Sequence, residues 1–320
     1  MVAEPPHPIA LHHEYALEPA AVQDWRDLRS WASLVGWEHG RLLSDLPDGK
    51  WLAELKLVLE RHPAGLDGKR GEALLAQWRT QPHLRFVRRK LKQPSREGWA
   101  QSVARAEQTR QFHQVVSAGD QADLPLEALA NDVPPLLRAP EQVAEALVLL
   151  LQSSSRIRLV DPYFNPTRSR YLKALSLLLR RATWQGTYRR TSGDDHLQII
   201  IETCPPNEAD RSTDRAICQQ WCQLPALRAA VPAPHLVQLR FWRDKDLADP
   251  KPVFHNRYLL TDRGGVIFPH GLDFGADDQR ELHDDITRMT ASQWVAREAD
   301  FNASPTAYEK VAEGQIWGKV

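Results

Sequence analysis

The stretch Leu197-Gln-Ile-Ile-Ile-Glu-Thr203 decides the fold class of this chain. It is a nearly continuous β-branched run, which is typical of a strand buried on both faces of a sheet. Strands of this kind belong to sheets that carry helices on their faces. The run therefore predicts an α/β fold, and we tested this prediction on the sequence to either side of it.

Helical and strand patterns alternate around this run. Before it, the sequence predicts a helix from Pro140 to Leu150, a strand over Ile157–Val160 that ends at Asp161-Pro162, and a helix over Tyr171–Leu179. After it come a helical region over 208–230, a strand over His235–Trp242, and two strands, Val253–Leu260 and Gly265–Phe268, around the turn Thr261–Gly264. This order predicts a mixed sheet flanked by helices.

Residues 1–116 have a different pattern, with apolar side chains at helical spacing and no β-branched alternation. The three periodic stretches are Trp25–Val35, Trp51–Leu59 and Leu74–Trp78. Residues 117–140 are interrupted by four prolines and Gly119, as a linker would be. We therefore expect a mostly helical domain over 1–116, a linker over 117–140 and an α/β domain over 141–320.

The composition excludes several classes of protein. Among 320 residues, 41 are basic and 41 are acidic, so a nucleic-acid site would have to be a local patch. No apolar run approaches the roughly 20 residues that span a bilayer, and the first residues do not resemble a secretory signal. Three cysteines do not form a disulfide framework. These features favour a cytoplasmic protein without a transmembrane segment.

The stretch Phe254–Gly265 carries the most informative chemistry. In a strand, residues two apart share a face, so His255 and Arg257 are expected to point the same way. Asp262 lies at the turn that follows, so we expect all three side chains to meet near one strand end. An imidazole can attack phosphorus, and a guanidinium can hold phosphate oxygens in a fork. The pattern indicates phosphoryl chemistry, although an isolated His-x-Arg is also common as a surface pair.

The spacing resembles the signature His-x-Lys-x-x-x-x-Asp of the phospholipase D superfamily, with Arg257 in place of the lysine. In that family the motif lies on a late strand of an α/β domain that opens with a strand, as Ile157–Asp161 does here. The resemblance covers residues 141–320. It implies a phospholipase D-like sheet and catalytic roles for His255, Arg257 and Asp262.

Within the superfamily, the chain looks most like the C-terminal phospholipase D-like domain of MIT-domain proteins, which carries a single His-x-Arg motif. Four matching features follow one another in the same order: Asp161-Pro162-Tyr163, then His255 and Arg257, then Gly264 and Gly265, then Gly271-Leu272-Asp273. The resemblance implies that Asp161, Tyr163, Gly271 and Asp273 contribute to substrate binding. The resemblance implies that the site uses no metal and no cofactor. It also implies that prokaryotic relatives are encoded in defence-type gene neighbourhoods.

Two alternatives stay open on this evidence. The first is a metal-independent phosphodiesterase, most plausibly a nuclease, in which His255 attacks phosphorus. Because the chain has only one motif, catalysis would require a homodimer. The second is a degenerate module that binds a phosphate-bearing ligand, a lipid or a partner protein. Leu272 follows Gly271 where active members place serine, which favours the second alternative.

A local excess of basic residues lies between Arg79 and Arg110, with Phe86 and Trp99 among them. Such a stretch can follow a nucleic-acid backbone or an anionic membrane. The candidate nucleic-acid residues are Arg85, Arg88, Arg89, Lys90 and Lys92. A solvated helical face would produce the same pattern, and residues 1–116 could instead bind a partner protein.

The cysteines are Cys204, Cys218 and Cys222. Two of them are one helical turn apart, which would permit shared metal ligation with His196 or His235. Because no Cys-x-x-Cys is present, we interpret them as buried thiols.

Overall fold

The structure, a computed structural model, describes residues 11–46, 49–62, 65–89, 99–107, 114–117, 136–183, 188–191, 197–206, 211–245, 256–274, 283–302 and 308–318. The chain divides into two compact units. The C-terminal unit comprises residues 1–11, 133–184 and 195–320, and the N-terminal unit comprises residues 12–132 and 185–194. Residues 185–194 therefore group with the N-terminal unit, although they lie inside the range 141–320.

The C-terminal unit contains a seven-stranded sheet in the order β13-β11-β10-β6-β8-β9-β14. The strands are β6 (Arg156–Val160), β8 (Gln198–Thr203), β9 (Leu236–Asp244), β10 (Tyr258–Thr261), β11 (Gly265–Ile267), β13 (Thr287–Arg288) and β14 (Tyr308–Trp317). Strands β6, β8 and β9 are parallel, and the remaining pairs are antiparallel. The prediction of a mixed α/β sheet is confirmed, and the run that suggested it forms β8.

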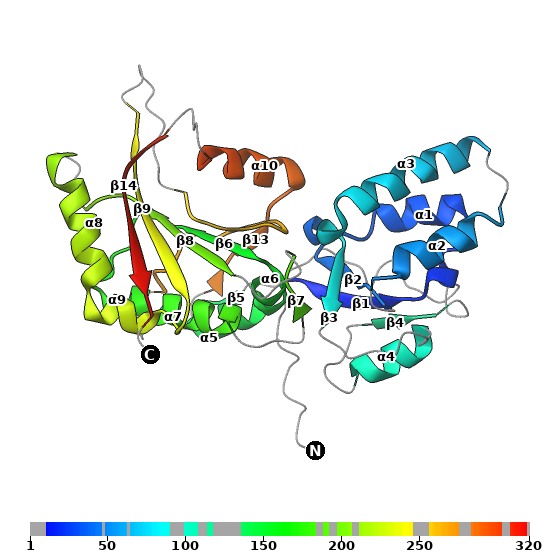
Figure 1. Cartoon of the computed structure of the whole chain (residues 1–320), viewed down its shortest axis with the longest axis horizontal. Helices are drawn as coiled ribbons and strands as arrows, with labels where there is room; N and C mark the ends of the chain where they lie inside the picture. Colours follow the sequence, from blue (N-terminus) through cyan, green and yellow to red (C-terminus); the bar gives the residue numbers. More distant parts are fainter. Residues whose placement is uncertain are drawn as a thin grey trace. The chain divides into compact units, whose positions relative to one another are not determined.

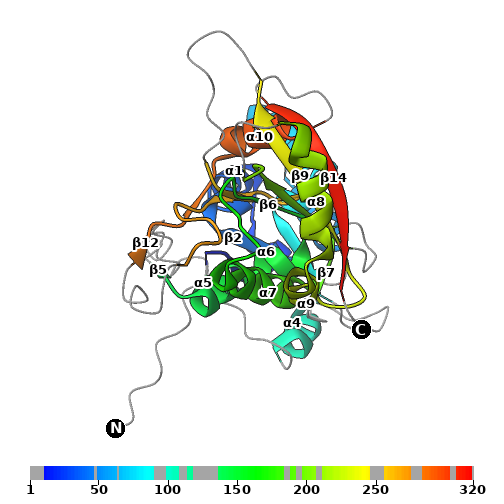
Figure 2. The same cartoon turned by 90° about the vertical axis from the view of Figure 1, so that its left-hand side faces the viewer.

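Helices cover both faces of this sheet (Figures 1 and 2). One face carries α5 (Pro140–Ala146), α6 (Val148–Ser153), α7 (Ser169–Thr183), α8 (Asp214–Gln223) and α9 (Pro225–Ala230), and the other carries α10 (Ala291–Asp300). A 3-10 turn over Arg211–Thr213 precedes α8, and β5 (Leu136–Leu137) pairs with β12 (His283–Asp284) in a separate two-stranded sheet.

The apolar core lies between the sheet and α5–α9. Alternate residues of each strand face it, among them Leu159 and Ile201, which pack with Leu175 and Leu178 of α7. Ile201 is fully buried, and burial of such a side chain contributes about 1.5–3 kcal/mol. Helix α7 is therefore held by the periodic apolar stripe that the sequence predicts.

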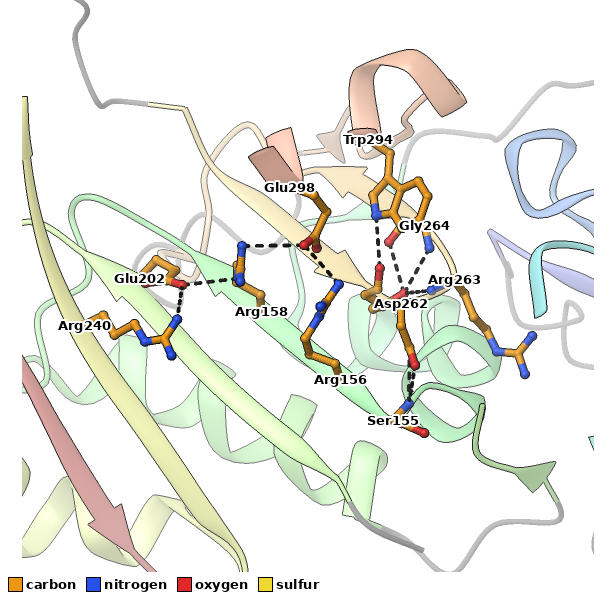
Figure 3. A network of polar contacts seen from close by, with 11 residues as sticks. Ser155, Arg156, Arg158, Glu202, Arg240, Asp262, Arg263, Gly264, Trp294 and Glu298 are labelled. Atoms are coloured by element: carbon orange, nitrogen blue, oxygen red, sulfur yellow. Dashed lines mark hydrogen bonds and ion pairs between the residues drawn. The ribbon is translucent and has the colours of Figure 1, made fainter. Parts of the chain in front are cut away.

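The opposite face of the same sheet is ionic (Figure 3). Arg158 of β6 lies 3.2 Å from Glu202 of β8 and 3.6 Å from Glu298 of α10. Arg240 of β9 lies 3.5 Å from Glu202, and Arg156 donates a hydrogen bond to Glu298 at 3.0 Å. Charges of opposite sign thus alternate across three strands and fix α10 to the sheet.

The N-terminal unit contains a five-stranded sheet in the order β4-β1-β2-β3-β7, which corrects the expectation that residues 1–116 are mostly helical. The strands are β1 (His13–Leu17), β2 (Arg41–Ser44), β3 (Phe86–Arg89), β4 (Gln114–Val116) and β7 (Tyr188–Arg189). The first four are parallel, and β7 pairs antiparallel with β3.

The predicted helices of this unit are present at their expected places, as α1 (Trp25–Ala32), α2 (Trp51–Leu59) and α3 (Leu66–Thr80), with α4 (Trp99–Glu107) added. Short 3-10 turns occur at Pro19–Ala21, Trp37–His39 and Pro82–Leu84. The strands were missed because β1 and β2 contain residues such as leucine, alanine, glutamate and arginine, which also favour helices. Pairing with neighbouring strands, rather than local preference, determines their conformation.

Local signals explain where two helices begin. Asp24 caps α1 by accepting hydrogen bonds from the backbone N–H groups of Arg26 and Asp27 at 2.7 and 2.9 Å. Thr290 and Gln293 form a reciprocal capping box at the start of α10. Within the described ranges, no helix combines the length and hydropathy needed to cross a bilayer.

Candidate anion-binding site

The candidate site lies at the carboxyl end of β6, where Asp161 follows the last residue of the strand. Strands β6 and β10 are antiparallel, with Tyr258 opposite Val160. This register brings Arg257, just before β10, beside Asp161, just after β6. The Nε atom of Arg257 lies 3.9 Å from Oδ1 of Asp161. Two of the residues singled out in the sequence therefore meet.

Asp161 is buried, with 1% of its surface exposed. Its Oδ1 accepts a hydrogen bond from the backbone N–H of Tyr163 at 3.0 Å, and its Oδ2 accepts one from Leu272 N–H at 2.7 Å. Burial raises the pKa of this carboxyl to about 6, although the two hydrogen bonds and Arg257 lower it. Asp161 therefore changes its charge close to neutral pH.

Gly271 allows the Asp161 carboxylate to be held in this way. Its φ is +60°, in the left-handed region, and a Cβ atom there would collide with Oδ2 of Asp161 and approach Cδ of Arg257. Only glycine avoids both problems. The Gly271 position predicted from the sequence thus shapes the turn that binds Asp161.

Arg257 is held at the surface of the site by two contacts. Its Nη1 donates a hydrogen bond to the Pro269 carbonyl at 2.7 Å, and its guanidinium lies over the Tyr163 ring, 4.5 Å from the centroid. Its side chain is 27% exposed, and its Nε has no hydrogen-bond partner among the described residues. Tyr163, which is 52% exposed, presents an open aromatic surface next to this cation.

Asp273 organises the other side of the Gly271 turn. Its Oδ2 accepts hydrogen bonds from Arg170 Nη2 at 2.7 Å and from the Tyr171 hydroxyl at 3.2 Å. Its backbone carbonyl accepts a hydrogen bond from Arg138 at 3.1 Å. Asp273 therefore orients arginines beside the site, a positioning role that differs from direct contact with a ligand.

A small recess opens beside these groups, with room for about one water molecule. Asp161, Tyr258, Phe268 and Gly271 are among its lining residues. A ligand larger than water does not fit into this recess and would instead contact the exposed surfaces of Arg257 and Tyr163.

Asp262 does not join this site, which corrects the expectation that it would meet Arg257 at one strand end. It lies at the opposite end of β10, where its two carboxylate oxygens accept a hydrogen bond from the backbone N–H of Ser155, each at 3.2 Å (Figure 3). The four residues of β10 separate Arg257 from Asp262, and five steps of extended chain span roughly 16 Å. Asp262 connects β10 to the start of β6.

His255, the predicted nucleophile, lies outside the described residues, so its position relative to Arg257 stays a prediction. Lys90 and Lys92 of the basic stretch also lie outside them.

Three of the candidate nucleic-acid residues, Arg85, Arg88 and Arg89, lie within the described ranges, and they differ in exposure. Arg89 is wholly buried in an ion pair with Glu14. Arg88, on β3, is bonded to Asp45 at 2.8 Å, and Arg85 lies over the Trp78 ring. Arg89 is therefore closed to a ligand, whereas the Arg88 side chain is 53% exposed, and the nucleic-acid assignment of the stretch stays a prediction.

Cys218 and Cys222 are buried on α8, as thiols in a core would be, and Cys204 is partly buried. Among the described residues, no group of three histidine, cysteine or acidic side chains is arranged to hold a metal ion.

Sequence reasoning missed Arg170, Tyr171 and Arg138. Arg170 and Tyr171 lie in the first turn of α7, shortly after the Asp-Pro-Tyr segment. A signal for these residues was available in the sequence. Helix α7 follows β6 and begins near the carboxyl end of that strand, so polar residues in its first turn are candidates for the site.

The geometry defines an α/β unit with an arginine-lined site at a strand end. The chain matches no protein-family model, and no curated protein or solved structure is significantly similar to it.

Proposed function

We propose that the C-terminal unit is a phospholipase D-like module that binds a phosphate-bearing ligand, with Arg257 as the clamp. The observation that supports this most directly is the state of Arg257. It is fixed in place by Pro269 and Tyr163, yet its Nε has no hydrogen-bond partner among the described residues. The Nε atom is buried, but 27% of the Arg257 side chain is exposed, and the exposed part of a fixed guanidinium fits phosphate oxygens.

The weak pairing of Asp161 with Arg257 also supports binding of an anionic ligand. Its carboxylate is the acidic group closest to Arg257 in the described site, and its pKa is raised to about 6. Nε of Arg257 lies 3.9 Å from Oδ1 of Asp161, which is too long for a hydrogen bond, and both carboxylate oxygens are held by backbone N–H groups. Arg257 can therefore exchange this weak partner for a phosphate.

Binding of inorganic phosphate, measured by calorimetry, tests the proposal. We expect Arg257→Ala to weaken binding about 10- to 100-fold, which corresponds to the loss of a hydrogen bond to a charged group. Arg180→Ala, at the exposed far end of α7, is the matched control. Equal phosphate affinity in wild type and Arg257→Ala would overturn the proposal.

A second candidate is hydrolysis of phosphodiesters, with nucleic acid in a prokaryotic defence system as the substrate, by a homodimer in which His255 attacks phosphorus. The spacing His255-x-Arg257 favours this second candidate, because it would place the nucleophile two residues from Arg257, which lies beside Asp161 in the described site. Hydrolysis of bis(p-nitrophenyl) phosphate in EDTA, lost in His255→Ala and dependent on dimer formation in sedimentation, would support turnover. Arg257-dependent phosphate binding without hydrolysis would leave the module as a binding protein.

A further inference from the structure

We infer that the site binds two phosphate groups of one molecule, one on Arg257 and one on Arg170. This inference rests on the proposed function and specifies the ligand class. It starts from the Gly271 turn, which has an arginine on each side: Arg257 is bonded to Pro269 before the turn, and Arg170 to Asp273 after it.

The two anchor points are close together. Pro269 and Asp273 are four residues apart, so even an extended chain would separate their Cα atoms by at most roughly 14 Å. The hydrogen bonds from Gly271 N–H to the Phe268 carbonyl and from Asp273 N–H to the His270 carbonyl fold the segment into turns and shorten this span. Both guanidiniums therefore border one small area of surface.

Arg170 has the same features as the clamp residue. Asp273 holds its Nη2 at 2.7 Å, and its guanidinium lies 5.7 Å from the centroid of the Tyr171 ring, as Arg257 lies over Tyr163. Its side chain is 38% exposed, and its Nε has no hydrogen-bond partner among the described residues. Each arginine is thus fixed by one hydrogen bond and lies near an aromatic ring, and each keeps part of its side chain exposed.

The charges indicate two anionic groups. Three arginines, Arg138, Arg170 and Arg257, surround the turn, and the acidic groups among them are Asp161 and Asp273. In the described part of the chain, three arginines therefore face two carboxylates, which leaves an excess of one positive charge even when Asp161 is ionised. Arg170 is ion-paired with Asp273, but its side chain is 38% exposed, so it can hold a second phosphate beside that carboxylate.

Two sources share this chemistry, a diphosphate and a pair of neighbouring phosphodiesters. The experiment compares inorganic phosphate, pyrophosphate and the trinucleotide pTpTpT by calorimetry. We expect pyrophosphate or the trinucleotide to bind at least 10-fold more tightly than phosphate. Tighter binding of pyrophosphate would identify a diphosphate as the ligand, and tighter binding of the trinucleotide would identify neighbouring phosphodiesters. Arg170→Ala should remove this excess while leaving the affinity for phosphate within 3-fold of wild type.

Arg170→Lys keeps the charge without the planar fork and should retain part of the excess, and Arg180→Ala should retain all of it. Unfolding curves of each variant verify that the proteins are folded. Equal affinity for all three probes, or a higher affinity for pyrophosphate and trinucleotide that survives in Arg170→Ala, would overturn the inference. In that case, phosphate binding that depends on Arg257 would still support the proposed function. If no probe binds, the proposed function fails together with the inference.

Discussion

Glu14 and Arg89 form a two-pronged ion pair inside the N-terminal unit. Nε of Arg89 donates to Oε1 of Glu14 at 2.9 Å and Nη2 donates to Oε2 at 2.6 Å, with both side chains nearly or wholly buried. The Tyr188 hydroxyl donates to the same carboxylate at 2.6 Å. The pair joins β1 to β3 across β2, and the tyrosine adds β7 to it.

Removing one member of this pair should destabilise the protein strongly. We expect Arg89→Ala to lower the free energy of unfolding by about 3–5 kcal/mol, because Glu14 would remain buried without its cation. Arg88→Ala is the control, since its side chain is 53% exposed and its ion pair with Asp45 should contribute less than about 1 kcal/mol. Denaturant unfolding measures both, and equal losses would contradict the buried pair.

Gly271→Ala should damage the site and the fold together. A side chain in the left-handed region costs about 1–3 kcal/mol, and the added methyl group would also displace Asp161. We expect phosphate affinity to fall at least as far as in Arg257→Ala. Gly65→Ala provides a control because a Cβ atom there meets nothing within 4 Å. Unchanged stability and affinity in Gly271→Ala would show that the turn is differently formed.

Stability should depend on pH through Asp161. The folded state raises the pKa of this carboxyl from 3.8 to about 6, so the folded protein binds the proton more tightly than the unfolded chain. The resulting stabilisation is fully present below pH 3.8 and is lost as the pH rises to about 6, amounting to roughly 3 kcal/mol. Unfolding of wild type and Asp161→Asn from pH 4 to 7 should differ in slope over this range, and parallel curves would refute the shift.

Anion affinity should change over the same pH range. Protonation of Asp161 removes the negative charge beside Arg257, so binding should strengthen as the pH falls from 7 to 5. Sulfate is the suitable probe, because phosphate itself titrates near pH 6. The increase should be absent in Asp161→Asn, and an equal pH dependence in both proteins would assign the effect to another group.

The sequence predicted the C-terminal unit better than the N-terminal one, for a physical reason. Strand β8 is a β-branched run with a local signal of its own, whereas β1 and β2 become strands only through their neighbours in a parallel sheet. Strand β14 was missed in the same way, since Val311 and Ile316 are its only β-branched residues.

The candidate site shows the same division. The sequence named Asp161 and Arg257 as residues of one site, and the antiparallel pairing of β6 with β10 does bring them side by side. Arg170 could not be found, because its role depends on where α7 begins relative to the Gly271 turn. Asp262 was misplaced because sequence spacing does not reveal that four residues of β10 separate the two ends.

The position of β7 has a consequence for synthesis on the ribosome. Strand β3 is in the N-terminal unit, but its partner β7 is made only after β6 and α7 of the C-terminal unit. Domains usually fold in the order in which they emerge. Here the N-terminal sheet remains incomplete, with the edge of β3 open and Glu14 lacking its tyrosine, until residue 189 has left the exit tunnel. The two units must therefore mature in overlapping steps during translation.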